Sequence, residues 1–420
     1  MFDLIKRLFP IPRSITGNGV RESLSIIKEY FPIQIREVKT GTKVFDWTVP
    51  KEWNIQDAYL KNSKGEKIVD FKKSNLHVLG YSIPVHKKMR LDELKPHLFT
   101  SPKYPDCIPY LHSYYKENWG FCLTQKQFDT LEDDIYEVVI DSTLSDGSLT
   151  YGEYYLKGEL EDEVLITSYI CHPSLCNDNL SGVVLLTFLA NYLKDKKLRY
   201  SYRFLLIPET IGSITWLSLN EEKIKNIKYG LVVTCIGDPG ISTYKKSRQG
   251  NALIDKIAEK ALIDSKEPYE IIDFFPMGSD ERQFCSPGFN LPVGSLMRTP
   301  YWKFPEYHSS ADNLDFISGE KMANSLKKYL EILYIIENNA TYLNLNPKCE
   351  PQLGSKGLYR SIATERKCEV DEYIMLWVLN YSDGFHSLLD ISVLAKAKFV
   401  KIKKAAELLL SHGLLKRINS

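Results

Sequence analysis

The sequence predicts an α/β protein in which helices cover both faces of a mixed β-sheet. Strand-like and helical segments alternate from residue 160 to 339, short strand-like pieces fill 42–115, and three helical patterns follow the polar linker 344–357. Repeated strand–helix units are typical of a mostly parallel or mixed sheet. The expected domains are a discontinuous main domain at 1–42 and 116–343, an inserted β-rich domain at 43–115 and a C-terminal module at 344–420.

The composition is that of a globular protein with two or three domains. Of the 420 residues, 44% are hydrophobic, and the net charge of +1 creates no global field toward nucleic acid or membrane. The start, MFDLIKRLFPIPRSITG, lacks the apolar core of a signal peptide, and the longest apolar run, 183–190, is too short to span a bilayer. Eight sparse cysteines without a CxxC pair favour reduced thiols and a cytoplasmic location.

Hydrophobic periodicity predicts the elements of the main domain. Residues 15–30 predict an amphipathic helix that Asn18 could cap, and 135–141 and 153–158 predict two strands around the turn signal SDGS. Functional residues should lie on loops beyond the carboxyl ends of the sheet strands. The further strands expected are 164–170, 202–208, 230–236 and 292–297, and the further helices are 181–195, 214–224, 251–264 and 322–339.

The C-terminal module predicts a winged-helix-like fold. Its three helical patterns begin at Glu372, Ser387 and Phe399, and the strand-like LLKRI follows. Its basic residues could contact nucleic-acid phosphates, but the helix lacks base-reading Arg, Asn or Gln, which favours a solvated or protein-docking face. The last 30 residues hold one acid, Glu407, and the basic residues Lys396, Lys398, Lys401, Lys403, Lys404, Lys416 and Arg417.

Five polar residues follow the expected sheet strands or lie near a strand end. Two histidines, two aspartates and a glutamate suit a divalent transition metal, above all zinc, with the glutamate as general base. The recurrence of such residues at successive strand ends is more specific than any one of them. The five residues are His172, Asp178, Glu209, Asp238 and His308.

Each of these residues also has an interpretation without a metal. His172 could bond to backbone at its strand end, and Asp178 could cap the following helix. Glu209 could cap a helix or form a salt bridge, and His308 could pair with an acid on a surface loop. Asp238 precedes Pro-Gly, which is ordinary turn chemistry, and is the weakest of the five.

Two cysteines lie beside the first histidine in CHPSLCNDNLSG. Cys171 ends an apolar strand and is expected in the core. Cys176 could lie near the metal, but the spacing from Cys171 has no second pair, so neither a thiolate ligand nor a redox pair is favoured.

At this point the residues resemble a known family. The succession of DNLSG before a helix, FLLIPETIG, a strand-end aspartate, MGSDERQF and EYHSSADN resembles the M28-type zinc aminopeptidases. Over nearly all its length the chain is similar to a bacterial group with an aminopeptidase-like domain, an inserted domain and a C-terminal winged helix. That group is often associated with surface-polysaccharide gene clusters. The resemblance implies a zinc-exopeptidase-like mixed sheet sandwiched by helices.

The resemblance also assigns roles. It implies that His172 and His308 bind metal, that Asp178 bridges two zinc ions, and that Glu209 is the general base. Asp238 approximately matches a further carboxylate ligand.

A second motif supplies candidate substrate-binding residues. In SDERQF, Ser279 and Asp280 match a motif close to the family's site. Arg282 could grip a substrate carboxylate or carbonyl, or it could form a structural ion pair with Asp280 or Glu281.

Three departures from the family's pattern bear on the metal count. Ser174 stands where an aspartate usually orients the first histidine, Thr210 stands where a second acidic residue usually follows Glu209, and Asp238 aligns only with a shift. We therefore expect one well-bound zinc, although two remain compatible with the pattern. In an alternative, Glu209 is itself a ligand and no base remains. The expected ligands of the single ion are His172, Asp178 and either His308 or Asp238.

These expectations combine into a zinc-dependent amide-bond hydrolase, aminopeptidase-like, with a small peptide or other amide as substrate. An N-acyl sugar or peptide-like conjugate of polysaccharide biosynthesis is the second substrate class. Alternatives are an inactive binding protein of the same fold and a nucleic-acid or protein partner at the winged helix, and the chain could form a homo-oligomer. Aromatic residues that could stack on substrate, or belong to the core, are Tyr301, Trp302, Phe304 and Tyr307.

Overall fold

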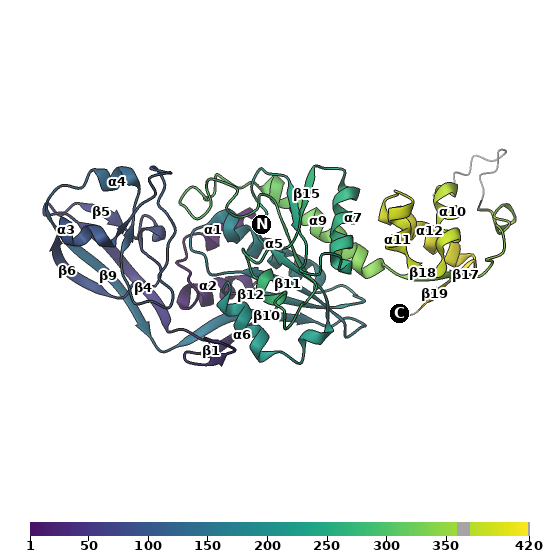
Figure 1. Ribbon diagram of the computed structural model, residues 1–420, viewed down its shortest axis with the longest axis horizontal. Coiled ribbons are helices and arrows are strands. Elements are labelled where there is room, and N and C mark those ends of the chain that lie inside the picture. Colours follow the sequence, from purple (N-terminus) through teal and green to yellow (C-terminus); the bar gives the residue numbers. More distant parts are fainter. Residues whose placement is uncertain (359–369, 419–420) are drawn as a thin grey trace. The chain divides into compact units, whose positions relative to one another are not determined.

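The structure is a computed structural model that describes residues 1–358 and 370–418. The chain folds into two compact units (Figure 1). One comprises Met1–Ile254 with Pro268–Leu326, and the other comprises Asp255–Glu267 with Lys327–Ser420. The domain boundaries expected from the sequence stay predictions.

The first unit contains an eight-stranded mixed sheet, as predicted. Its four central strands, β12, β11, β13 and β16, are parallel to one another, while antiparallel pairs flank them. The strands in spatial order are β1 (Gln34–Lys39), β10 (Ser148–Leu156), β12 (Ser201–Ile207), β11 (Glu163–Tyr169), β13 (Ile227–Val233), β16 (Val293–Met297), β14 (Ser242–Lys245) and β15 (Tyr269–Ile272).

Helices lie on both faces of this sheet. Leu24 of α2 (Asn18–Ile27) packs where a Cβ at Gly152 would stand. Trp216 of α6 (Ile211–Leu219) donates a 3.2 Å hydrogen bond to Glu153. Successive residues of a strand point to opposite faces, so α2 and α6 cover opposite faces of β10. Further helices of this unit are α1 (Phe2–Leu8), α5 (Gly182–Leu193) and α8 (Glu281–Phe284).

The cap of α2 differs from the expectation. Gly17, not Asn18, is the N-cap residue, and the side-chain oxygen of Asn54 accepts the Asn18 N–H at 2.7 Å. Gly17 has a φ of 100°, and a Cβ there would lie 2.1 Å from the carbonyl oxygen of Trp53. Only glycine fits such a close approach without strain, so the chain path against Trp53 decides the helix start.

A second, four-stranded antiparallel sheet builds the inserted region (Figure 1). The long strand β9 pairs with β4 and β6 in this sheet, and β10 begins soon after it in the main sheet. The turn SDGS therefore joins the two sheets. The elements of the inserted region are β2 (Lys43–Val44), β3 (Trp47–Thr48), β4 (Glu52–Lys61), β5 (Lys67–Asp70), β6 (Val85–Arg90), α3 (Leu91–Leu94), β7 (Leu98–Phe99), β8 (Phe121–Cys122), α4 (Gln125–Asp129) and β9 (Ile135–Ser145).

The second unit contains the three predicted C-terminal helices and a three-stranded sheet. Helix α12 packs against both α10 and α11. Two strands of the sheet, β17 and β18, were not predicted, because TYLN directly follows the long helical pattern and DGFHS is mostly polar. The elements are most of α7 (Leu253–Ser265), the later part of α9 (Gly319–Asn338), and β17 (Thr341–Asn344), α10 (Glu372–Tyr381), β18 (Asp383–Ser387), α11 (Leu388–Leu394), α12 (Phe399–Ser411) and β19 (Leu415–Ile418).

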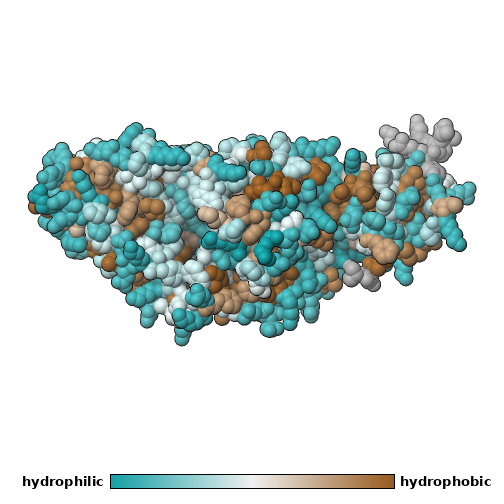
Figure 2. Space-filling model, in the orientation of Figure 1, coloured by the Kyte–Doolittle hydropathy of each residue, from teal (hydrophilic) through white to brown (hydrophobic). Residues whose placement is uncertain are grey.

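The surface mixes hydrophilic and hydrophobic residues. On the face drawn in Figure 2, hydrophilic side chains predominate and hydrophobic ones occur in separate patches. None of the helices in the described ranges has the length and apolar character needed to cross a membrane.

Candidate metal centre

The candidate site lies at the carboxyl-terminal edge of the parallel strands. His172 follows β11, Glu209 follows β12, and His308 lies on the long loop after β16. Asp178 belongs to the turn Cys176–Ser181, directly before α5. The carboxyl ends of parallel strands meet at one edge of a sheet, where α/β proteins commonly bind ligands.

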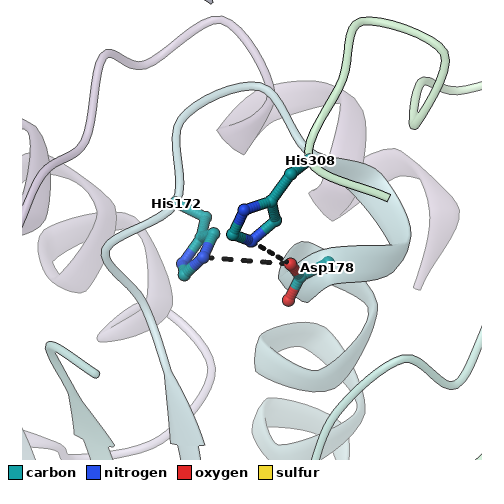
Figure 3. Close-up of side chains that lie close together, drawn as sticks. All are labelled: His172, Asp178 and His308. Carbon is teal, nitrogen blue, oxygen red and sulfur yellow. Dashed lines mark ion pairs between the residues drawn. The ribbon is translucent and has the colours of Figure 1, made fainter. Parts of the chain in front are cut away.

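Three of the predicted residues come together in a cluster (Figure 3). One ligand atom from each of His172, Asp178 and His308 lies within 4.8 Å of the others. Asp178 Oδ2 is 3.8 Å from His172 Nε2 and 3.0 Å from His308 Nε2. The side chains of Asp178 and His172 are 1% and 6% exposed and that of His308 is 31% exposed, and the two histidines line a pocket.

These atoms suit a metal ion of zinc's chemistry. Two imidazole nitrogens and one carboxylate oxygen form a donor set of catalytic zinc sites, whose ligand atoms stand about 3.3 Å apart in a tetrahedron. Buried polar atoms normally have partners. Among the described residues, Asp178 Oδ2 and His308 Nε2 are buried and make no hydrogen bond. A cation between them would satisfy both.

Neighbouring residues orient Asp178. The hydroxyl of Tyr169 donates to Asp178 Oδ1 and lies 2.6 Å from Thr234 Oγ1. The carboxylate of Asp312 accepts the backbone N–H groups of Asn177 at 2.6 Å and of Asp178 at 2.8 Å. These contacts hold the turn in place and leave Oδ2 directed at the histidines.

Contacts with Arg13 and Cys171 position His172. The guanidinium Nε of the buried Arg13 donates a 3.1 Å hydrogen bond to the His172 carbonyl oxygen, and His172 Nδ1 lies 3.4 Å from Cys171 Sγ. Burial lowers the pKa of His172 to about 3, although Asp178 opposes this shift. The imidazole is therefore neutral at ordinary pH, which is the form that binds metals.

Glu209 lies beside the cluster. Its Oε2 is 3.8 Å from His172 Nε2, and its side chain is 26% exposed. The Glu209 N–H donates to Cys171 Sγ at 3.3 Å, so the strand-end cysteine supports this loop. Burial, together with the nearby charges of Asp280 and Asp178, raises the pKa of Glu209 well above its ordinary value. A carboxyl group with a raised pKa is suited to carrying a proton.

The residue after Glu209 is strained and firmly held. Thr210 has a φ of 64°, which is unfavourable for a β-branched residue. Its N–H donates a 2.7 Å hydrogen bond to Asp280 Oδ1, and its hydroxyl accepts one of 2.8 Å from Arg282. Asp280 therefore lies under the Glu209 loop, and burial raises its pKa to about 6. Strain of this kind is often found at functional sites.

Arg282 faces the cavity with unused donors. Its side chain forms no ion pair with Asp280, Glu281 or any other described carboxylate, and its Nε is buried without a partner in the described part of the chain. The guanidinium lines the same pocket as Glu209 and the two histidines.

Asp238 is not brought to the cluster. It is 1% exposed and accepts hydrogen bonds from the Asn177 side-chain amide, the Thr299 N–H and hydroxyl, and the Gly240 N–H. Both carboxylate oxygens are thereby used to join the loops after β13 and β16. Through Asn177, Asp238 supports the turn that carries Asp178.

The two candidate substrate-binding tyrosines lie outside the pocket lining. Tyr301 is 4% exposed, and its hydroxyl donates a 2.9 Å hydrogen bond to Glu281, which also pairs with Lys245. Tyr307 stacks on the His308 ring with centroids 4.0 Å apart. Tyr301 therefore belongs to a buried polar network, and Tyr307 covers one face of the His308 ring.

Sequence reasoning missed four residues around the site: Tyr169, Asp312, Arg13 and Tyr110. Asp312 lies in EYHSSADN, so the motif contained a signal, but its carboxylate binds backbone N–H groups rather than a metal. Tyr169 is hidden in an apolar strand pattern. Arg13 and Tyr110 lie far from the strand ends in sequence, and only the folded chain brings them to His172.

The sheet and its strand-end site define an α/β protein with the fold of zinc aminopeptidases. The chain is similar to BSAP, a zinc aminopeptidase from Bacillus subtilis, with a TM-score of 0.58, 12% identity, and coverage of 80% of this chain and 94% of that chain. An M28 peptidase precursor from Shewanella amazonensis gives a TM-score of 0.55, 12% identity, and coverage of 80% and 92%. At such identities the likeness shows the fold alone, and it confirms the predicted fold class.

The chain belongs to the family described as a domain of unknown function, DUF4910, whose model matches residues 2–339. Residues 340–417 match a winged helix-turn-helix model, which confirms the predicted C-terminal module. A Clostridium acetobutylicum protein, provisionally named for polysaccharide biosynthesis and an aminopeptidase-like domain, is 63% identical over 418 residues, covering 100% of this chain and 96% of that protein. A crystal structure of a provisionally named peptidase from the same organism has a TM-score of 0.95, 62% identity, and coverage of 99% and 96%.

Proposed function

We propose that the chain is a zinc-dependent amide-bond hydrolase. The observation that carries the proposal is the convergence of His172, Asp178 and His308 on one point, where two of the three ligand atoms are buried and make no hydrogen bond among the described residues. The aminopeptidase fold and the names of the similar proteins support the same reaction class. A substrate from polysaccharide biosynthesis agrees with the name of the Clostridium acetobutylicum relative, and a cytoplasmic location is part of the proposal.

The residues divide the work of such a reaction. His172, Asp178 and His308 would hold the ion, which supplies Lewis-acid chemistry by polarising a carbonyl and making water more acidic. Glu209, within 4 Å of His172, would take the proton of the attacking water and deliver it to the leaving nitrogen. Arg282 would orient a carboxylate or carbonyl of the substrate through its free donors.

The proposed site holds one zinc ion rather than two. Thr210 offers a hydroxyl that already accepts a hydrogen bond from Arg282, and Asp238 is used by protein donors. Neither is therefore available as the extra carboxylate that a second zinc would need. Glu209 lies outside the three-residue cluster, which favours the base over the ligand role.

Two measurements test this function. Metal analysis of the purified chain should find about one zinc per chain. Glu209→Gln should keep that zinc and lower amide hydrolysis by about 10²- to 10⁴-fold, the usual contribution of a general base. Glu306→Gln is the matched control, because Glu306 is half-buried on the His308 loop and does not line the pocket. A chain that takes up no zinc, or full activity in Glu209→Gln, would contradict the proposal.

The winged helix is proposed as a protein-docking or solvated face rather than a DNA reader. Lys403 is paired with Glu407 at 2.6 Å, whereas Lys398, Lys401 and Lys404 are exposed. We expect no shift of duplex DNA even in low salt, because the chain's net charge is only +1. A gel shift that weakens steeply as salt rises would contradict this expectation.

A further inference from the structure

An aromatic wall from the inserted region faces the candidate metal centre. The pocket that contains His172, His308 and Glu209 has a volume of about 330 Å³. Such a volume accommodates a small molecule rather than a folded partner. The wall is formed by Trp47, Tyr110, His112, Tyr114 and Tyr115, all of which line this pocket.

The wall is hydrogen-bonded to the loop that carries His308, one of the proposed metal-binding residues. The Tyr110 N–H donates a 2.8 Å hydrogen bond to the carbonyl oxygen of His308, and Pro109 and Ser309 form an antiparallel bridge. The Ser310 N–H donates to the carbonyl oxygen of Ile108 at 2.9 Å. The Tyr110 ring also lies 5.1 Å from that of His308. The inserted region is therefore hydrogen-bonded to the site and forms part of it.

The wall pairs its aromatic rings and leaves two of them, Trp47 and Tyr115, partly exposed. His112 stacks on Tyr114 with centroids 3.7 Å apart, and Trp47 meets Tyr115 edge-on at 5.5 Å. Trp47 is 40% exposed and Tyr115 is 52% exposed, and both line the pocket. Aromatic side chains arranged in this way bind the flat face of another ring, whether aryl or sugar.

The charges of the pocket disfavour a free amino terminus. Among the described residues that line it, Glu209 is the one carboxylate and Arg282 the one guanidinium. An α-ammonium group would have to share Glu209, which the proposed reaction needs as a base, and would be repelled by Arg282. Arg282 has no carboxylate partner among the described residues, and a guanidinium fork matches a carboxylate.

We propose that the wall and Arg282 select small N-acylated carboxylic acids that carry a ring, and reject free-amino peptide ends. This inference rests on the proposed hydrolase function and names its substrate class. In the reaction, water adds to the acyl carbon and the C–N bond breaks. The acyl group leaves as a carboxylate, and the nitrogen leaves as an amine with the proton that Glu209 carries. Arg282 holds the acid, and the ring stacks on Trp47 and Tyr115.

Calorimetric titration of the zinc-loaded full chain tests this proposal. The probes are N-acetyl-L-tyrosine, which carries an aryl ring, N-acetylmuramic acid, which carries a sugar ring, and L-tyrosine amide, which has a free amine and no carboxylate. Wild type and Glu209→Gln are both titrated. Wild type shows whether a probe is hydrolysed, and Glu209→Gln shows whether the intact probe binds. We expect at least one N-acetylated acid to bind about tenfold or more tightly than L-tyrosine amide. Whichever N-acetylated acid binds more tightly shows whether the pocket prefers an aryl or a sugar ring.

Variants separate the wall from the fold. Arg282→Gln, Arg282→Lys and Tyr115→Ala should each weaken binding of the N-acetylated acid by roughly tenfold and leave zinc content unchanged. Tyr192→Ala is the matched control, because Tyr192 is 53% exposed on α5 and lies outside the pocket lining.

The outcomes distinguish this proposal from the function on which it rests. Tighter binding of L-tyrosine amide, no binding of either N-acetylated acid, or wild-type affinity in all three pocket variants would overturn the substrate class. Zinc-dependent hydrolysis of aminoacyl amides alone would overturn it while the hydrolase stands. Arg282-dependent binding of an N-acetylated acid by a chain that hydrolyses no amide would support the ligand class and contradict the hydrolase.

Discussion

At the residue scale, Asp178 shows how a buried carboxylate keeps one oxygen for a cation. Asp312 binds its backbone N–H, and Tyr169 donates to its Oδ1. Its Oδ2 faces the two histidines with no hydrogen bond from any described residue. A buried carboxylate oxygen without a hydrogen bond is destabilising, and a cation held between Asp178 and the two histidines would stabilise this arrangement. We therefore expect zinc affinity to depend on residues that do not touch the ion.

Tyr169→Phe tests this dependence. The substitution removes the hydroxyl that orients Asp178 and keeps the ring in the core of β11. We expect zinc affinity to fall by about 10- to 100-fold, the usual effect of losing a partner of a metal ligand. Competition with a chelator measures this change.

The control is another buried tyrosine. Tyr136, in the inserted sheet, donates a 2.9 Å hydrogen bond to the Glu132 carbonyl oxygen, so Tyr136→Phe removes one hydroxyl far from the site. Tyr136→Phe should bind zinc like wild type. Equal zinc affinity in Tyr169→Phe and Tyr136→Phe would show that the hydroxyl of Tyr169 does not position Asp178.

At the scale of elements, a charged contact fastens the inserted sheet to the main domain. Arg21 on α2 donates two hydrogen bonds of 2.7 Å to the carboxylate of Glu52 on β4. Glu52 also accepts the N–H of Ser148, where β10 begins. The hydrogen bonds from Arg21 lower the pKa of Glu52 to about 2.

Glu52→Gln should destabilise the chain near neutral pH by about 1 to 2 kcal/mol, because the bidentate charged contact is lost. The pKa of Glu52 is lower in the folded chain than in the unfolded one, so its contribution is complete above about pH 5 and is lost toward pH 2. Urea unfolding at several pH values should therefore show wild type and Glu52→Gln converging as the pH falls.

Glu29→Gln is the comparison for this contact. Glu29 forms a similar fork with Arg7, but the two side chains are 54% and 45% exposed. Exposed ion pairs contribute little to stability, so this variant should unfold almost like wild type. An equal loss in both variants would show that the position of Glu52 between the two sheets has no special weight.

The central elements could be predicted because their sequences leave little choice. The apolar strands β11, β12, β13 and β16 and the apolar helix α5 all occur within a few residues of the predicted ranges. The edge strands β1 and β15 and the neighbouring strand β14 were not predicted, because QIREVK, YEII and STYK are short and lack clear alternation. Their conformation comes from the partner strand rather than from intrinsic propensity.

The site was only partly visible in the sequence for a related reason. His172, Asp178 and His308 could be selected because each lies near a strand end, and the fold brings them together. The pocket wall could not, because Tyr110 meets His308 through a hydrogen bond between segments that are far apart in the chain. The sequence analysis instead selected aromatic residues near His308 in the sequence as substrate-binding candidates. One of them, Tyr301, is buried outside the pocket.

At the scale of the whole molecule, the winged helix shares a compact unit with parts of α7 and α9. The Lys260 ammonium on α7 donates a 2.8 Å hydrogen bond to the Ala397 carbonyl oxygen, and Asp264 accepts the Phe399 N–H at 2.8 Å. Phe399 is fully buried and meets the ring of Tyr334 on α9. The family model that ends at residue 339 therefore divides a packed core.

Truncation of the chain after residue 339 should lower its melting temperature and promote aggregation. The deletion removes Phe399 and leaves the nearly buried Lys260 and Asp264 without their backbone partners. Lost burial and unpaired polar groups both destabilise a fold. Calorimetry and light scattering measure the effect. Zinc content should stay near that of the full chain, because the three candidate ligands belong to the other unit.

Phe399→Ala in the full chain is the milder form of the same test. Loss of a fully buried phenylalanine should destabilise its unit by about 3 to 5 kcal/mol. Because the ligands lie outside that unit, calorimetry should then show an early transition for Asp255–Glu267 with Lys327–Ser420, while zinc still raises the temperature of the later one. A single transition whose zinc response is lost in Phe399→Ala would show that the metal centre and the winged helix unfold together.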